Sequence, residues 1–190
     1  MKKGLSLIEL QIAMAIFVAL IVVVGSAYYA TTKLFNEERE IMNITSQNRI
    51  AVDNITNQVR EAVSVVTGCT VCGVSTESDA TTLIISLWPI DVDGTAFEPT
   101  GNEFDYLVYR LDSSPNDTNL LLEIFPNGTT SSRITTSKIL AVDTKTILFE
   151  YDNVDSAQAT QVTLTITNET DTFTRTHSIT ETVTVRLRNK

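Results

Sequence analysis

The feature that most constrains the fold of this chain is an uncharged apolar segment near its N-terminus. From Leu10 to Thr32 there is no charged residue, and most positions carry Leu, Ile, Val, Ala, Met or Phe. A helix rises about 1.5 Å per residue, so roughly 20 such residues cross a hydrocarbon core about 30 Å thick. Lys2 and Lys3 precede the segment, and their charge predicts a cytoplasmic N-terminus with the rest of the chain translocated. The segment therefore predicts a single membrane-spanning helix.

Two common kinds of N-terminal segment share part of this pattern. A secretory signal peptide has an apolar region of about 7–15 residues followed by a small-x-small cleavage site. Gly25-Ser26-Ala27 has small residues of that kind, but the apolar stretch before it is too long for a signal peptide. A plain single-pass anchor fits the length, but it gives no special role to the residues that come before the apolar segment.

Those preceding residues carry a specific motif. They read Lys2-Lys3-Gly4-Leu5-Ser6-Leu7-Ile8-Glu9. This start resembles the prepilin leader of type IV pilins and type II secretion pseudopilins. In that family a short basic leader ends in Gly, the next residue is apolar, and a Glu is the fifth residue of the mature chain. Gly4, Leu5 and Glu9 match those three positions, although the family most often has Phe where this chain has Leu5.

The resemblance implies that prepilin peptidase cleaves residues 1–4 from the chain between Gly4 and Leu5 and N-methylates Leu5. It also implies that Glu9 pairs with the freed amine of Leu5 in a neighbouring subunit. Independently, an ionised carboxylate in hydrocarbon costs about 2.5–3.5 kcal/mol, so Glu9 needs a physical reason. The alternative reason is that Glu9 lies in the first helical turn near the membrane surface, where the helix dipole favours a negative charge.

Helical periodicity continues after the apolar segment. One apolar stripe, interrupted by Asn48, recurs at spacings of three or four residues or their multiples: Ile41, Ile44, Val52, Ile55, Val59, Val63 and Val66. No proline occurs before Pro89, and Gly25 is the only glycine between Leu5 and Gly68. The pattern predicts one helix from Leu5 to about Val66, with a transmembrane half at 5–32 and an amphipathic half at 33–66. The alternative is two helices with a hinge at Gly25 or Asn36.

The remaining residues, 67–190, have the composition of a β-rich extracytoplasmic head. Alternating apolar and Thr residues indicate antiparallel strands with one wet face, and turn residues such as Asn127-Gly128 separate them. The expected fold class is α+β, a pilin fold in which the long helix packs on an antiparallel sheet. The predicted strands are Thr81–Trp88, Glu103–Leu111, Asn119–Phe125, Lys138–Val142, Thr146–Tyr151, Gln161–Thr167 and Thr182–Arg188. The order of the helix and the strands also resembles that of J-type minor pseudopilins and W-type minor pilins. Three passages carry this resemblance: Val59-Arg60-Glu61-Ala62, Leu140 to Tyr151 and Val183 to Asn189.

Few residues suggest site chemistry. Cys69 and Cys72 form a C-x-x-C. A catalytic redox motif would need a thioredoxin-like βαβ setting, and a structural zinc site needs four ligands where the chain has a single His, so neither is supported. The pattern favours a local disulfide, with free thiols as the alternative. Asp91 and Asp93 resemble part of a calcium loop, but their spacing departs from an EF-hand and a hydrated acidic turn is the preferred reading. No catalytic residues and no cofactor are expected.

The charge and the motif together lead to one expected function. A formal net charge of −9 argues against affinity for nucleic acid. The resemblance implies a structural minor pilin or pseudopilin in the inner membrane, and then in a pilus or pseudopilus. Its partners would be prepilin peptidase, other minor and major pilins or pseudopilins, and membrane lipid. The alternative is a single-pass anchored module whose extracytoplasmic head binds a ligand.

Overall fold

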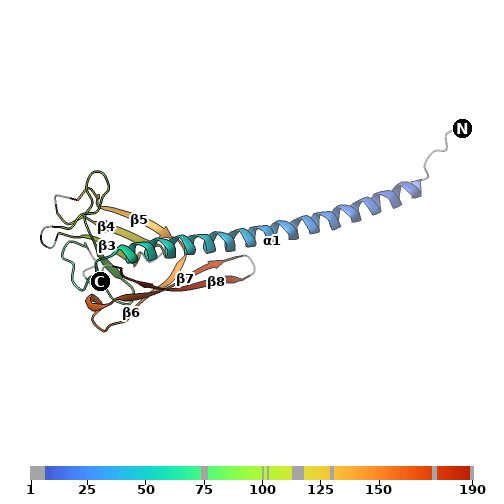
Figure 1. Ribbon diagram of the computed structural model, residues 1–190. Helices are drawn as coiled ribbons and strands as arrows, with labels where there is room; N and C mark the ends of the chain where they lie inside the picture. Colours follow the sequence, from blue (N-terminus) through green and yellow to red (C-terminus); the bar gives the residue numbers. More distant parts are fainter. Residues whose placement is uncertain are drawn as a thin grey trace. The chain divides into compact units, whose positions relative to one another are not determined.

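The computed structural model describes residues 7–73, 77–99, 101, 103–112, 118–128, 131–172 and 175–188. The chain divides into two units, Met1–Ile41 and Met42–Lys190. The described part of the first unit is helical throughout, and it belongs to helix α1 (Leu7–Glu61). The second unit contains the last turns of α1 and the strands (Figure 1).

Helix α1 is a single element of 55 residues that passes through Gly25 and Asn36 without a break. The predicted single helix is thus confirmed, and the hinged alternative is wrong. The predicted end at Val66, however, is wrong, because α1 ends at Glu61. The next residues are rich in valine, and the N–H groups of Val63 and Val66 donate to the carbonyls of Ser86 and Ile84 at 2.9 Å. Pairing with a strand therefore replaces the last predicted helical turn.

The strands pair in antiparallel fashion, as the alternating pattern predicted, but they form two sheets where one was expected. The first sheet has the order β1-β2-β3-β4-β5 and the second the order β6-β7-β8. Every predicted strand has a counterpart, β7 and β8 are longer than predicted, and the short strand β1 was missed. The α+β class is confirmed. The bounds are β1 Ser64–Val65, β2 Leu83–Leu87, β3 Asp105–Leu111, β4 Leu120–Phe125, β5 Thr136–Ala141, β6 Thr144–Tyr151, β7 Gln161–Asp171 and β8 Thr176–Arg186, with a short 3₁₀ helix, η1, at Ser156–Gln158.

The main core of the second unit joins α1 to the inner faces of both sheets. On α1 the buried positions are Ile44, Asn48, Ala51, Val52, Ile55, Thr56 and Val59. The predicted stripe is therefore largely confirmed, but Asn48 lies within the buried face and does not interrupt it. The core also takes in strand residues such as Ile85 on β2 and Phe149 on β6. The last turns of α1 are therefore part of the same compact unit as the strands.

A buried hydroxyl links α1 to the first sheet. The hydroxyl of Tyr109 on β3 donates to Oδ1 of Asn54 at 3.4 Å. Burial, and then the negative charge of Glu61, raise the pKa of Tyr109 well above its ordinary value of 10.0. The hydroxyl accordingly stays protonated and remains a donor at any physiological pH.

The outer face of the second sheet carries paired threonines. Thr163, Thr165 and Thr167 on β7 lie opposite Thr184, Thr182 and Thr180 on β8. Their hydroxyl oxygens are 2.9 to 3.1 Å apart. The intervening residues Val162, Leu164 and Ile166 are buried, so the alternation in the sequence separates a wet face from a core face as predicted.

Candidate functional site

The predicted cleavage site lies at the N-terminus of the chain. Gly4 and Leu5 lie outside the described residues, so cleavage between them and methylation of Leu5 stay predictions. Glu9 lies in the first turn of α1 and is exposed. At that position the partial positive charge of the helix N-terminus favours a carboxylate.

The first half of α1 has an apolar surface that no other described part of the chain covers. All residues from Leu7 to Thr32 are exposed, and this helix is long and apolar enough to cross a membrane. The serine and threonine hydroxyl groups near the end of this stretch are satisfied internally: Ser26 and Thr31 donate to carbonyls one turn earlier, both at 2.8 Å. Because lipid offers no hydrogen-bond partners, this internal pairing suits a helix surrounded by hydrocarbon.

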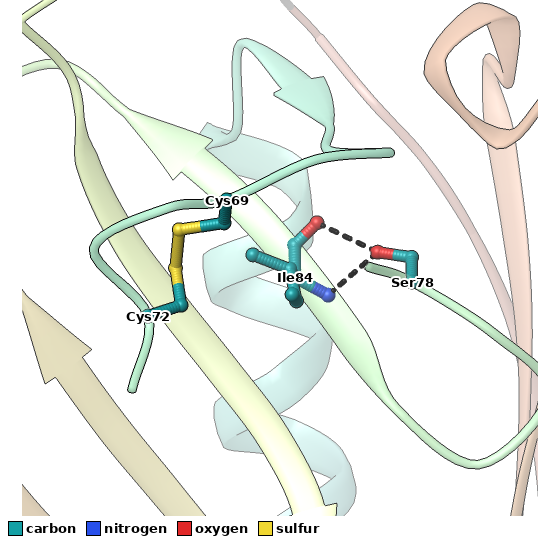
Figure 2. Close-up of a disulfide and its surroundings, with 4 residues drawn as sticks. All are labelled: Cys69, Cys72, Ser78 and Ile84. Atoms are coloured by element: carbon teal, nitrogen blue, oxygen red, sulfur yellow. Dashed lines mark hydrogen bonds between the residues drawn. A yellow bond between two sulfur atoms is a disulfide. The ribbon is translucent and has the colours of Figure 1, made fainter. Parts of the chain in front are cut away.

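The two cysteines form the disulfide that the spacing favoured. Cys69 and Cys72 are bonded, with their Cα atoms 5.5 Å apart, and they are 3% and 0% exposed. They pack with Ile84 and Val108 in a second, smaller cluster that is separate from the main core. Figure 2 shows the bond beside Ile84 of strand β2. The free-thiol alternative is therefore wrong.

The acidic turn at Asp91 and Asp93 is organised by its own backbone. Oδ1 of Asp91 accepts hydrogen bonds from the N–H groups of Asp93 at 3.0 Å and Thr95 at 2.8 Å. The N–H of Gly94, at φ 80°, donates to the carbonyl of Asp91. These contacts give Asp91 a role in closing the turn. Among the described residues there is no group of three His, Cys, Asp or Glu side chains placed to hold a metal ion.

One buried ion pair was missed by sequence reasoning. Oδ2 of Asp105, which is 0% exposed, accepts from a guanidinium nitrogen of Arg133 and from the hydroxyl of Ser131, both at 2.6 Å. The same nitrogen of Arg133 donates to the carbonyl of Trp88 at 2.6 Å. Together these bonds attach the connection between β4 and β5 to strand β3 and to the residue that directly follows β2. The pair joins residues 28 positions apart, and neither lies in a motif.

A polar pocket of about 340 Å³ lies where three connections of the head meet. On its wall Lys145 and Glu169 form an ion pair at 3.2 Å. The N–H of Glu169 donates to the carbonyl of Asp143, a non-glycine residue at φ 54°. The remaining lining residues are Thr118, Asp171 and Thr176. No sequence motif pointed to this pocket, because its residues come from strands β6, β7 and β8 and from two connections that are far apart in the sequence.

Comparison of the chain with models of known protein families, with curated proteins and with solved structures finds no match.

Proposed function

We propose that this chain is a minor subunit of a type IV pilus or of a type II secretion pseudopilus. In this proposal prepilin peptidase removes residues 1–4, and the mature subunit assembles through the first half of α1, as part of a small tip or initiation complex. The observation that carries the proposal is the continuous helix α1. Its first half is wholly exposed and apolar, and its last turns are buried in the core of the head.

The surface of α1 supports an assembling helix. Residues from Leu7 to Thr32 need a non-aqueous environment, which lipid supplies before assembly and the helices of other subunits supply afterwards. Tyr28 and Tyr29, 74% and 67% exposed, lie at the end of the apolar stretch. Aromatic residues of this kind are typical of the boundary between a membrane and water. The span would thus end near these tyrosines, with Lys33 beyond it.

Glu9 is the residue that separates an assembling subunit from a plain anchor. In a simple membrane anchor the helix dipole would favour Glu9 by only about 0.3–1 kcal/mol, whereas an ionised carboxylate in hydrocarbon costs about 2.5–3.5 kcal/mol. Pairing with the amine of Leu5 in a neighbouring subunit would offset that cost in a filament. The α+β arrangement of a long N-terminal helix followed by antiparallel sheets is also the one that the family resemblance implies.

The proposal is tested by coexpressing the full chain with prepilin peptidase and measuring the mass and N-terminus of the membrane protein. We expect a chain that begins with methylated Leu5. A retained Met1 would contradict the proposal and would favour the anchored ligand-binding module.

The role of Glu9 is tested separately by co-purification of partner subunits. Glu9→Ala should insert and be cleaved normally but recover far fewer partner subunits than the wild-type chain. Glu38→Ala, which removes an exposed carboxylate further along α1, is the matched control and should behave like wild type. Equal recovery with Glu9→Ala would refute the assembly role.

A further inference from the structure

The segment Thr67–Gly73, which we call the disulfide segment, covers one face of the first sheet. Strand β2 is buried on both faces: Leu83 and Ile85 belong to the main core, whereas Ile84 belongs to the smaller cluster with Cys69 and Cys72. Figure 2 shows the disulfide segment passing over β2 on the side of this smaller cluster. The segment therefore covers the outer face of β2, as α1 covers the inner face.

The disulfide segment is held to the sheet almost entirely by its two sulfur-bearing side chains. Cys69 and Cys72 are its only buried residues, while Thr67, Gly68, Thr70, Val71 and Gly73 are all exposed. Among the described residues the smaller cluster has four buried members, two of which are these cysteines, and Val66, Tyr106 and Phe125 pack against it. No other side chain of the segment contributes to the cluster, so its attachment depends on the conformation that the bond imposes on both cysteines.

The chain on either side of the disulfide segment is tied to β2 by hydrogen bonds around Ile84. The N–H of Val66 donates to the carbonyl of Ile84 at 2.9 Å, and the N–H of Ser78 donates to the carbonyl of Val66 at 3.2 Å. The hydroxyl oxygen of Ser78 accepts from the N–H of Ile84 at 2.9 Å and donates to the carbonyl of the same residue at 3.2 Å (Figure 2). The N–H of Ile84 is thus bonded to the side chain of Ser78, which follows the disulfide segment in the chain.

We propose that the Cys69–Cys72 disulfide is a redox latch that holds the disulfide segment closed over Ile84 and Val108. A dithiol reductant, or a thiol oxidoreductase that carries a dithiol, opens the latch. The dithiol is oxidised to its own disulfide, the bond between the two sulfur atoms breaks, and Cys69 and Cys72 each gain one electron and one proton. Oxidation by a disulfide reverses the exchange. The open state exposes an apolar face of β2 and β3 and leaves the main core intact.

The size of the effect follows from the length of the closed loop. A bond that closes a loop of four residues lowers the conformational entropy of the open segment. This entropy loss shifts the equilibrium toward the closed segment by about 20-fold. This factor is small compared with the equilibrium constants for unfolding of whole domains. The latch therefore controls local opening of the segment but not the folding of the head.

Hydrogen exchange of the full chain in detergent micelles tests the latch. Complete reduction with dithiothreitol is verified by a mass gain of two hydrogen atoms. The amide of Ile84 should then exchange about 20-fold faster than in the oxidised chain, whereas amides of the central strand β3 should keep their protection. The double variant Cys69→Ser, Cys72→Ser should show the fast rate at Ile84 both with and without the reductant.

Two results would overturn the proposal. Equal exchange of the Ile84 amide in oxidised and reduced chains would show that the bond does not hold the segment closed. A matching loss of protection throughout β3 would show that the bond stabilises the whole head. Thiol alkylation gives a second readout: Cys72, buried in the closed state, should react with a maleimide in the reduced chain without any loss of β3 protection.

Discussion

Replacing Arg133 by Met should destabilise the head by leaving the carboxylate of Asp105 buried without its cationic partner. Asp105 is 0% exposed, and its Oδ2 has only Arg133 and Ser131 as hydrogen-bond partners in the described residues. Removing one partner of a buried ion pair costs about 3–5 kcal/mol. The side chain of Arg133 is 19% exposed and Ser131 would still donate, so we expect a loss of about 3 kcal/mol.

The loss is measured by urea unfolding of the full chain in detergent micelles, followed by circular dichroism of the β-rich head. Arg175→Met, at an exposed arginine, is the matched control and should change the free energy of unfolding by less than about 0.5 kcal/mol. Adding Asp105→Asn to the Arg133→Met chain should restore part of the stability, because an uncharged amide is cheaper to bury than a carboxylate.

Two results would refute this reasoning. A loss below about 1 kcal/mol for Arg133→Met would show that the pair contributes no more than a surface salt bridge. Failure of Asp105→Asn to restore any stability would show that the cost does not come from the buried charge.

Two further changes test other parts of the head. Asn48→Leu should raise the free energy of unfolding by about 1–2 kcal/mol, because the side-chain amide nitrogen and oxygen of Asn48 are both buried without a hydrogen-bond partner in the described residues. Asn57→Leu, at an exposed position of α1, is the control. An unchanged or lower free energy of unfolding for Asn48→Leu would contradict this account. Hydrogen bonds from the hydroxyl of Thr160 and from backbone N–H groups hold the pKa of Asp152 below its ordinary value of 3.8. The unfolded chain therefore binds more protons at this site, and the stabilisation is present above pH 3.8 and lost as the pH falls through the folded pKa. Asp152→Asn should make unfolding less steep below about pH 4 in acid titrations, and an acid limb identical to wild type would contradict this.

Patterns that depend only on nearby residues predicted most of the elements. The uncharged stretch from Leu10 to Thr32 and the stripe through Ile44 and Val59 indicated one long helix, because a 3.6-residue period is a local property. Alternation of apolar and Thr residues located β7 and β8 in the same way. The disulfide was also accessible from the sequence, since Cys69 and Cys72 are the only cysteines and lie three residues apart.

Tertiary structure decided what depends on residues far apart in the chain. The end of α1 at Glu61 reflects pairing of Val63 and Val66 with β2, a partner some 20 residues away. The burial of Asn48 and the ion pair of Asp105 with Arg133 likewise arise where distant elements meet. A hydrogen bond or an apolar contact across such a separation leaves no period and no spacing in the sequence. The sequence thus determined which segments are helix and strand, and packing determined where the helix ends and which polar groups are buried.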